Sequence, residues 1–158
     1  MNTSLQDTKQ QSNSSPLLTI IIPHYNIPHM LKKLLDTIPV RDDIQVIVID
    51  DNSNVELEFY ASLIIKYPHV TFLTNETGVN SAGTCRNTGL NHATGRWVLF
   101  ADADDYFTDD FLSIISEYVE SDYDTVYFSP TSIDLTTGNK SDRHVRRRRC
   151  RDRNGKSY

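Results

Sequence analysis

Short apolar runs rich in β-branched residues recur along this chain, at residues 17–23, 44–50, 70–74 and 96–101. Runs of this kind, with few polar positions between the apolar ones, are typical of strands that are buried on both faces of a sheet. Residues 124–129, with the sequence DTVYFS, predict a fifth strand. Polar residues follow the runs, so one edge of the expected sheet should be polar.

Between these runs, apolar residues recur at helical spacing. Helices are predicted at residues 29–38, 57–67, 81–95 and 109–120. Pro28 suits the first turn of the first helix, and Gly95 suits the end of the third. We expect Thr108 to cap the fourth helix, with Asp109 and Asp110 in its first turn, where the helix dipole favours negative charge.

The alternation of strands and helices predicts an α/β fold, with a Rossmann-like, mostly parallel sheet and helices on both faces. In such sheets, ligands bind beyond the carboxyl ends of the strands. The segments expected there are rich in carboxylate and amide side chains, and they span residues 23–26, 50–53, 75–78 and 102–105. The sequence therefore places a ligand site at this edge.

Composition divides the 158 residues into three parts. Residues 17–139 are long enough for one domain with a hydrophobic core. Residues 1–16 are polar and lack the apolar segment of a signal peptide, so a disordered leader is predicted there. Residues 140–158 hold nine of the 16 Lys and Arg residues and two of the 21 Asp and Glu residues, which predicts a basic, disordered tail. The two cysteines fit no disulfide framework and no apolar run is long enough to span a bilayer, so we expect a cytoplasmic protein.

Carboxylates are concentrated after two of the predicted strands, as Asp50 and Asp51 and as Asp102, Asp104 and Asp105. Like charges at a strand end repel one another, and a bound cation would remove that repulsion. In an extended segment, Asp102 and Asp104 would project to the same side. Two such oxygen ligands suit Mg²⁺ or Mn²⁺, which complete their shells with water and substrate phosphates. The alternative is a solvated acidic turn or an acidic helix N-terminus, and the second acidic pair favours the metal site.

Other motifs with carboxylates at strand ends fit this sequence poorly. A calcium-binding EF-hand loop starting at Asp102 requires Gly and Glu where Phe107 and Ser113 stand. No GxGxxG follows the first predicted strand, so a dinucleotide cofactor is not expected. A signalling receiver domain needs a lysine after the fifth strand, where Pro130 and Thr131 stand. The five histidines show no metal-ligand spacing, and each is predicted to lie on the surface or in a loop.

Four segments in register resemble the donor-binding half of family 2 glycosyltransferases of the GT-A fold: LTIIIPHYN, VIVIDDNS, GVNSAGTCRNTGLNHATG and RWVLFADADDYF. The resemblance covers about residues 17–129. It implies that a nucleotide-diphospho-sugar is bound by the matching positions, which are Pro23, Tyr25, Asn26, Asp50, Asp51, Ser53, Gly78, Arg86, Asn87 and Asp102. By the same resemblance, Asp51 accepts a hydrogen bond from the base, and Asp102 and Asp104 form the metal-binding DxD motif. Thr84 and Cys85 depart from the family pattern, because small residues usually precede the arginine.

The resemblance implies an inverting hexosyltransferase that transfers sugar from a donor, with UDP-sugars favoured, to a glycan or other hydroxyl acceptor in surface polysaccharide synthesis. The family's general base lies further along, in an acceptor-binding half that this chain does not resemble. We therefore expect truncation or a frameshift near Val145, and a natural short form is the alternative. The alternative function is that of a truncated, non-catalytic module that binds a nucleotide sugar or a metal. The arginine-rich run suits anionic lipid at the inner face of the membrane or RNA. A disordered tail with no specific nucleic-acid partner is the interpretation we adopt.

Overall fold

The computed structural model describes residues 15–121, 123–128, 131–133 and 136–142. The chain forms two compact units, one ending at Asp109 and the other beginning at Asp110. Most of the predicted leader and most of the predicted basic tail lie outside the described residues.

The first unit contains a four-stranded parallel sheet with the strand order β3-β2-β1-β4. The strands are β1 (Leu18–His24), β2 (Ile44–Asp50), β3 (Val70–Thr74) and β4 (Trp97–Phe100). The predicted bounds of β2 and β3 are confirmed, and those of β1 and β4 differ by one residue at each end. Because all four strands run in the same direction, their carboxyl ends meet at one edge.

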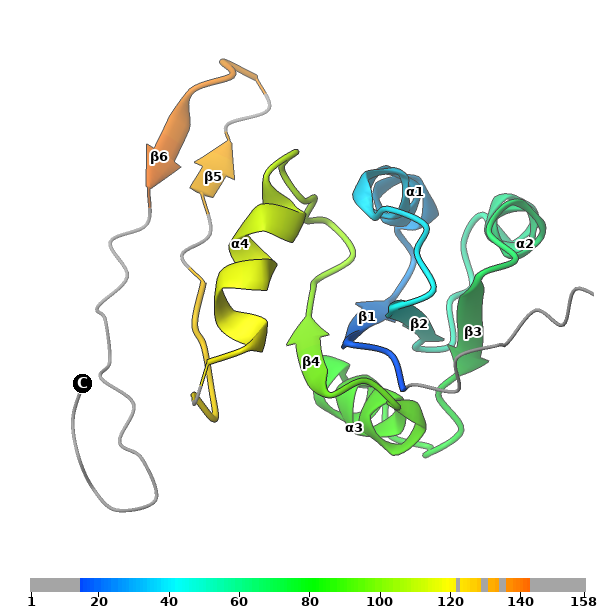
Figure 1. Ribbon diagram of the computed structural model, residues 1–158. Helices are drawn as coiled ribbons and strands as arrows, with labels where there is room; N and C mark the ends of the chain where they lie inside the picture. The colour runs from blue at the N-terminus through cyan, green and yellow to red at the C-terminus, as the bar shows by residue number, and fades with distance from the viewer. Residues whose placement is uncertain (1–14, 122, 129–130, 134–135, 143–158) are drawn as a thin grey trace, which may run out of the picture. The chain divides into compact units, whose positions relative to one another are not determined.

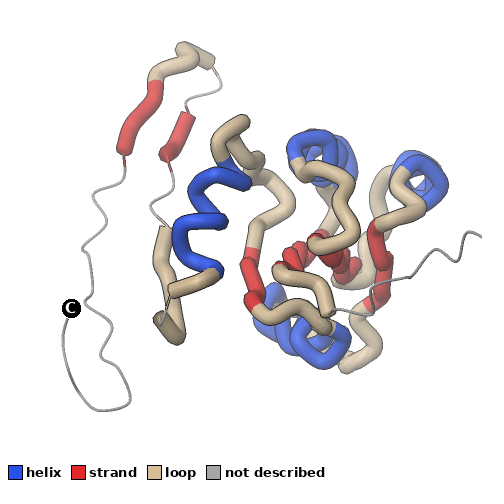
Figure 2. The backbone as a smooth tube through the Cα atoms, viewed as in Figure 1, coloured by secondary structure: helices blue, strands red, loops and turns tan. Residues whose placement is uncertain are grey.

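Helices cover both faces of this sheet, which confirms the predicted α/β architecture. Helices α1 (Pro28–Thr37) and α2 (Leu57–Lys66) lie on one face, and α3 (Ala82–His92) lies on the other (Figure 1). Figure 2 shows the same arrangement, with the helices on either side of the strands. Pro28 stands in the first turn of α1, as predicted.

The two central strands are buried on both faces, as their uninterrupted apolar sequences predict. Residues 20–22 of β1 and 47–49 of β2 are fully buried. Ile21, Ile47 and Ile49 form a cluster with Cys85 of α3, while Leu31 and Leu34 of α1 are also fully buried. These contacts keep the ends of β1 and β2 in a fixed relative position, on which the polar edge is built.

Two glycines permit close packing of α3 and of the segment after it. A Cβ at Gly89 would lie 2.4 Å from the Cγ2 atom of Ile21, so α3 can approach β1 only without a side chain there. A Cβ at Gly95 would lie 2.6 Å from the backbone nitrogen of Thr19. The prediction that Gly95 ends the helix is wrong, because α3 ends at His92 and Ala93 has an extended backbone. Gly95 instead allows this segment to pass close to β1.

The second unit contains α4 (Phe111–Val119) and an antiparallel pair, β5 (Thr131–Ile133) and β6 (Lys140–Asp142). The predicted cap at Thr108 is wrong: the carbonyl of Asp110 accepts the first helical hydrogen bond, from the amide of Ile114 at 3.0 Å. Asp109 and Asp110 therefore precede the first turn.

The strand predicted over residues 124–129 is not formed by its described residues, 124–128. A strand requires a hydrogen-bonded neighbour, and β-propensity alone does not supply one. Within the described residues, the sheet ends at β4. Ser129 lies outside the described residues.

Candidate functional site at the carboxyl edge of the sheet

The polar edge begins where two asparagines adopt left-handed backbone conformations, Asn26 after β1 (φ 56°) and Asn52 after β2 (φ 61°). Asparagine tolerates this conformation better than most residues, because its short side chain forms local hydrogen bonds. Both turns direct the chain away from the sheet at the end of its strand. The sequence VIVIDDNS thus ends β2 in a tight polar loop.

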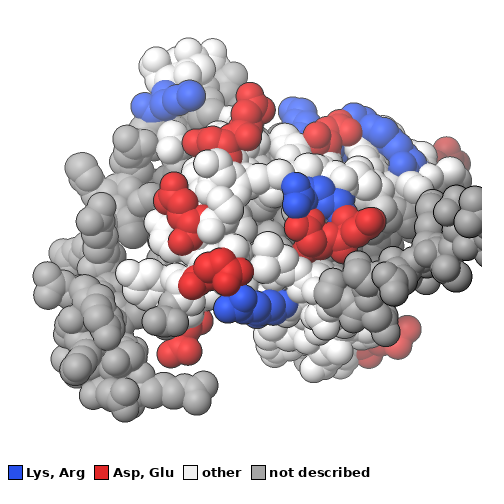
Figure 3. All heavy atoms as spheres, viewed as in Figure 1, with Lys and Arg blue, Asp and Glu red and all other residues white. Residues whose placement is uncertain are grey.

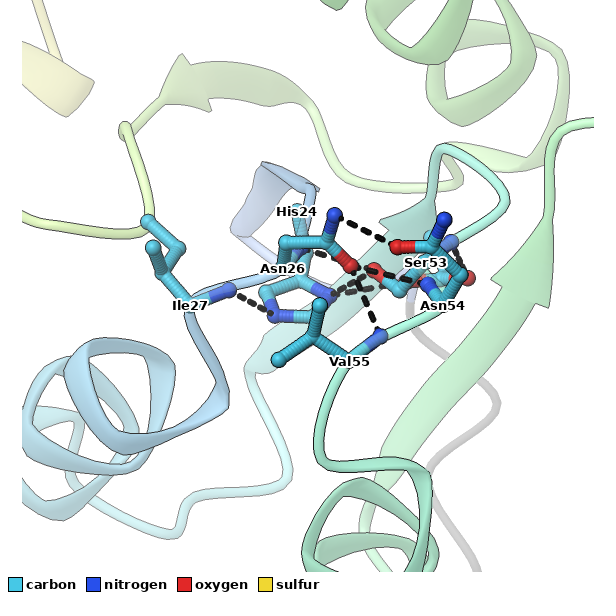
Figure 4. A network of polar contacts seen from close by, with 7 residues as sticks. His24, Asn26, Ile27, Ser53, Asn54 and Val55 are labelled. Carbon is cyan, nitrogen blue, oxygen red and sulfur yellow. Dashed lines mark hydrogen bonds and ion pairs between the residues drawn. The ribbon is translucent and has the colours of Figure 1, made fainter.

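The side chain of Asn26 joins the loops that follow β1 and β2 (Figure 4). Its Oδ1 accepts hydrogen bonds from the amides of Asn54 (2.8 Å) and Val55 (3.1 Å), and its Nδ2 donates to Asn54. The backbone amide of Asn26 donates to the Ser53 hydroxyl at 2.8 Å. Asn26 and Ser53 are therefore used to hold the two loops together.

His24 and Asp50 form a buried pair beneath these loops. The Nδ1 atom of His24 lies 2.8 Å from Oδ1 of Asp50, and the backbone amide of Ile27 donates to Nε2 at 3.3 Å. Since the backbone amide can only donate, Nε2 is the acceptor and the proton is on Nδ1, which assigns a neutral tautomer. The ring also stacks on Tyr60 of α2, with 5.0 Å between ring centroids. The prediction of a surface or loop position is wrong for His24, which is the last residue of β1 and is 1% exposed.

Both oxygens of Asp50 have partners within the protein, because Oδ2 accepts the backbone amide of Ser53 at 2.9 Å. Burial by itself would raise the pKa of Asp50, but the hydrogen bonds from His24 and Ser53 outweigh it and lower the pKa below its ordinary value. Asp50 is thus an ionised residue that holds the loop after β2, with its charge directed into the protein.

Asp51, the next residue, is held by a residue that follows β3, the neighbour of β2 on the side away from β1. The Nδ2 atom of Asn75, which follows β3, donates to its Oδ1 at 2.5 Å. Burial and then the negative charge of Asp51 raise the pKa of the Cys85 thiol to about 12, so this cysteine stays protonated beside the carboxylate. Sequence reasoning missed the role of Asn75, and the signal that could have revealed it was an asparagine at the end of a predicted strand.

After β4 the chain makes a turn in which the amide of Asp105 donates to the carbonyl of Asp102 at 3.0 Å. The expected extended segment is therefore wrong, and the turn, not strand alternation, sets the directions of Asp102 and Asp104. Ala103 is buried within the turn, whereas Asp102 and Asp104 are exposed. Burial and the charges of Asp104 and Asp102 raise the pKa of Asp105, so the three carboxylates interact electrostatically.

Arg86 of α3 is the cation at this turn. Its guanidinium donates to Oδ1 of Asp102 at 2.5 Å and lies over the ring of Phe100, 5.9 Å from the centroid. Asn87, the adjacent residue of the motif, is exposed. The structure thus brings the resembling segments of α3 and β4 together by an ion pair.

Three further positions from the sequence analysis flank this arrangement. Tyr25 follows β1 and is 51% exposed. Pro23 is half-buried within β1. Gly78 adopts a φ of 75°, which favours glycine, and no atom lies within 4 Å of where a Cβ would be.

The donor set at the β4 turn fits a divalent cation that shares its coordination with a ligand. Among the described residues, no three His, Cys, Asp or Glu side chains are grouped so as to hold a metal by themselves. Two exposed carboxylates, Asp102 and Asp104, can supply part of an oxygen shell, which suits Mg²⁺ or Mn²⁺ with phosphates completing it. On the face shown in Figure 3, acidic side chains form separate groups, several of them against Lys or Arg. In the part of the chain that the structure describes, no helix has the length and apolarity that crossing a bilayer requires.

The parallel sheet and the carboxylates at its carboxyl edge define an α/β protein with a polar ligand site beyond the carboxyl ends of its strands. The family model described as "Glycosyl transferase family 2" matches residues 19–157, and the chain belongs to this family. This match extends beyond residue 129, the end of the motif resemblance.

Solved structures with the same fold include complexes with nucleotides. S. aureus TarS in complex with UDP has a TM-score of 0.57 and 26% identity, over 65% of this chain and 32% of the TarS chain. Mannosyltransferase PcManGT from Pyrobaculum calidifontis, in complex with GDP-Man and Mn²⁺, has a TM-score of 0.58 and 26% identity, over 70% of this chain and 34% of its own.

A curated relative from Campylobacter jejuni, GalNAc(5)-diNAcBac-PP-undecaprenol beta-1,3-glucosyltransferase, is 28% identical over 71% of this chain and 37% of its own length. The chain spans between 14% and 37% of the lengths of the first three curated relatives that it matches. The similarity is therefore to one part of these glycosyltransferases.

Proposed function

We propose that this chain binds the nucleotide-diphospho-sugar donor of a family 2 glycosyltransferase, at the carboxyl edge of its parallel sheet. The observation that carries the proposal is the ion pair between Arg86 and Asp102, next to the exposed carboxylate of Asp104. A guanidinium beside two carboxylates offers donors for phosphate oxygens and ligands for a divalent cation at one place.

In this proposal, Asp102 and Asp104 hold Mn²⁺ or Mg²⁺ together with the donor diphosphate. The cation, when bound, would stabilise the charge that develops on the departing nucleoside diphosphate. Arg86 donates to the same diphosphate or to the base, and its contact with Asp102 keeps the guanidinium oriented before the ligand arrives. The PcManGT complex with Mn²⁺ supports a divalent cation in proteins of this fold.

The nucleoside end of the donor is assigned to the loops after β1 and β2. Asp51 accepts a hydrogen bond from the base, and the exposed ring of Tyr25 provides an apolar contact. Asn26, Asp50 and Ser53 act by holding these loops, since their polar atoms are hydrogen-bonded within the protein. Pro23, Gly78 and Asn87 complete the proposed site residues.

We assign a UDP-sugar as donor and a glycan, including one linked to a polyprenol, as acceptor. The TarS complex with UDP and the undecaprenol-linked acceptor in the name of the Campylobacter relative support this assignment. Such an acceptor would bring the protein to the inner face of the membrane. The second candidate, for the 158 residues by themselves, is a nucleotide-sugar-binding module that does not transfer sugar, because they match only part of each relative.

Isothermal titration calorimetry of the 158-residue chain with UDP, with and without Mn²⁺, tests the proposal. UDP binding should strengthen in Mn²⁺, and Asp104→Ala should remove that strengthening while leaving metal-free binding unchanged. Asp109→Ala, which removes a nearby exposed carboxylate outside the turn, is the matched control and should retain the effect. Equal UDP affinities of the wild-type chain with and without Mn²⁺ would contradict the metal assignment.

A further inference from the structure

We propose that Asn75 selects the base of the nucleotide, by occupying one oxygen of Asp51 so that a base with a single hydrogen-bond donor is preferred over one with two adjacent donors. The proposal rests on the assignment of Asp51 to the base. It adds a residue to the site and predicts that uracil is preferred over guanine.

The amide of Asn75 is held in one orientation. Its Oδ1 accepts the backbone amide of Thr77 (3.1 Å) and the Thr77 hydroxyl (2.7 Å). A backbone amide can only donate, so this atom must be the oxygen, and the nitrogen must face the other way. Asn75 is 2% exposed, which leaves the side chain no room to turn over.

Both hydrogens of the Asn75 amide nitrogen then have acceptors. Nδ2 donates to Oδ1 of Asp51 at 2.5 Å and to the carbonyl of Val79 at 2.9 Å, with the hydroxyl of Thr84 at 3.2 Å. The residue thus ties β2 and β3 to the start of α3. It keeps one of the two acceptor positions of Asp51 Oδ1 filled whether or not a ligand is present.

Asp51 is consequently limited in what it can accept from a ligand. A carboxylate with both oxygens free accepts two parallel hydrogen bonds from a pair of adjacent donors. Guanine presents such a pair, N1–H and the N2 amino group, whereas uracil presents only N3–H between two carbonyls. Only 8% of the Asp51 surface is exposed and Oδ1 is already bonded, so a single donor is the better match.

Thr84 and Cys85, which depart from the family pattern, are both part of this arrangement. The departure is therefore explained as support for Asp51 from α3. A substitution that frees Oδ1 should alter the choice between bases more than the binding of phosphates, because the diphosphate is assigned to the β4 turn.

The test compares the affinities of UDP and GDP for the wild-type chain, Asn75→Ala and Thr77→Ala, by calorimetry in Mn²⁺. The wild-type chain should prefer UDP by about tenfold or more, the range of one hydrogen bond to a charged group. Asn75→Ala should bring the ratio of the two affinities towards one. Thr77→Ala, which releases the Asn75 amide from an exposed loop, should lower the ratio partially, and Asn91→Ala on the exposed surface of α3 should leave it unchanged.

The ratio of the UDP and GDP affinities distinguishes base selection by Asn75 from a structural role, because a damaged fold would lower both affinities by the same factor. If the wild-type chain binds UDP preferentially and neither variant changes the ratio, the selection role of Asn75 is overturned and the proposed donor site stands. If the wild-type chain binds GDP as well as UDP, the selection role is overturned too. If it binds neither nucleotide, the proposed function and the role of Asn75 both fail.

Discussion

Replacing His24, at the carboxyl edge of the sheet, with alanine is expected to lower the free energy of unfolding by about 2–4 kcal/mol. The side chain donates a hydrogen bond to the ionised Asp50, and a bond to a charged group contributes about 1.5–3 kcal/mol. Its stacking on Tyr60 adds about 0.5–1.5 kcal/mol. Of its hydrogen bonds to His24 and Ser53, Asp50 would retain only the one to Ser53, and its carboxylate would remain buried.

The assay is urea unfolding followed by circular dichroism, at pH 7 and at pH 3. His24→Asn is the matched variant, because its side-chain amide can reach Asp50 from a position near Nδ1 while losing the ring. It should cost about half as much as His24→Ala. Equal losses for the two variants would show that packing of the ring, and not the hydrogen bond, accounts for the effect.

The destabilisation caused by His24→Ala should also depend on pH. The pKa of Asp50 is lower in the folded chain than its ordinary value of about 3.9. The stabilisation from its ionised form is therefore complete above about pH 4 and is lost as the pH falls through the folded pKa. The difference between wild type and His24→Ala should shrink at pH 3, and a difference that stays constant with pH would refute the assignment of an ionised Asp50.

Three further outcomes are expected. Asp51→Ala should lower the affinities for uridine and UDP by the same factor in equilibrium binding, with or without Mn²⁺. A loss of affinity seen only in the presence of Mn²⁺ would place Asp51 near the phosphates. Gly95→Ala should lower the free energy of unfolding by about 1–3 kcal/mol, because its Cβ would lie 2.6 Å from the backbone of β1, and a variant as stable as wild type in urea would contradict this packing. The purified 158-residue chain should hydrolyse radiolabelled UDP-sugars slowly and elongate no glycan acceptor, since it matches only part of its relatives; robust elongation would refute the module without transfer.

The sheet could be predicted closely from the sequence because its central strands are buried on both faces. The apolar run at 44–50 predicted the bounds of the central strand β2 directly, and the run at 70–74 did the same for β3, although β3 is a partly exposed edge strand. The parallel order followed from the alternation with helices. The segment at 124–128 has the β-propensity of a strand but forms none, because a strand also depends on a hydrogen-bonded neighbour.

Within the candidate site, the sequence indicated which segments would meet but not how each side chain would be used. Asp50 and Asp51 look equivalent in the sequence, and only the structure shows that Asp50 is bonded to His24 while Asp51 is bonded to Asn75. Because His24 lacks metal-ligand spacing, a surface or loop position is predicted for it, although its place after an apolar run is compatible with burial. The turn at Ala103 depends on one backbone hydrogen bond, which no periodicity reveals.

The central claim is that the donor binds at the carboxyl edge of the sheet, and nuclear magnetic resonance of the ¹⁵N-labelled chain tests it most directly. UDP would be added first and Mn²⁺ second, and the loss of amide signals near the paramagnetic ion would be mapped along the chain. We expect signal loss at Asp102, Asp104 and Arg86, and we expect the signals of Asp43 and Gly95, at the opposite ends of the strands, to be retained. Signal loss centred on that opposite edge, or no change on adding Mn²⁺ to the UDP-bound chain, would contradict it.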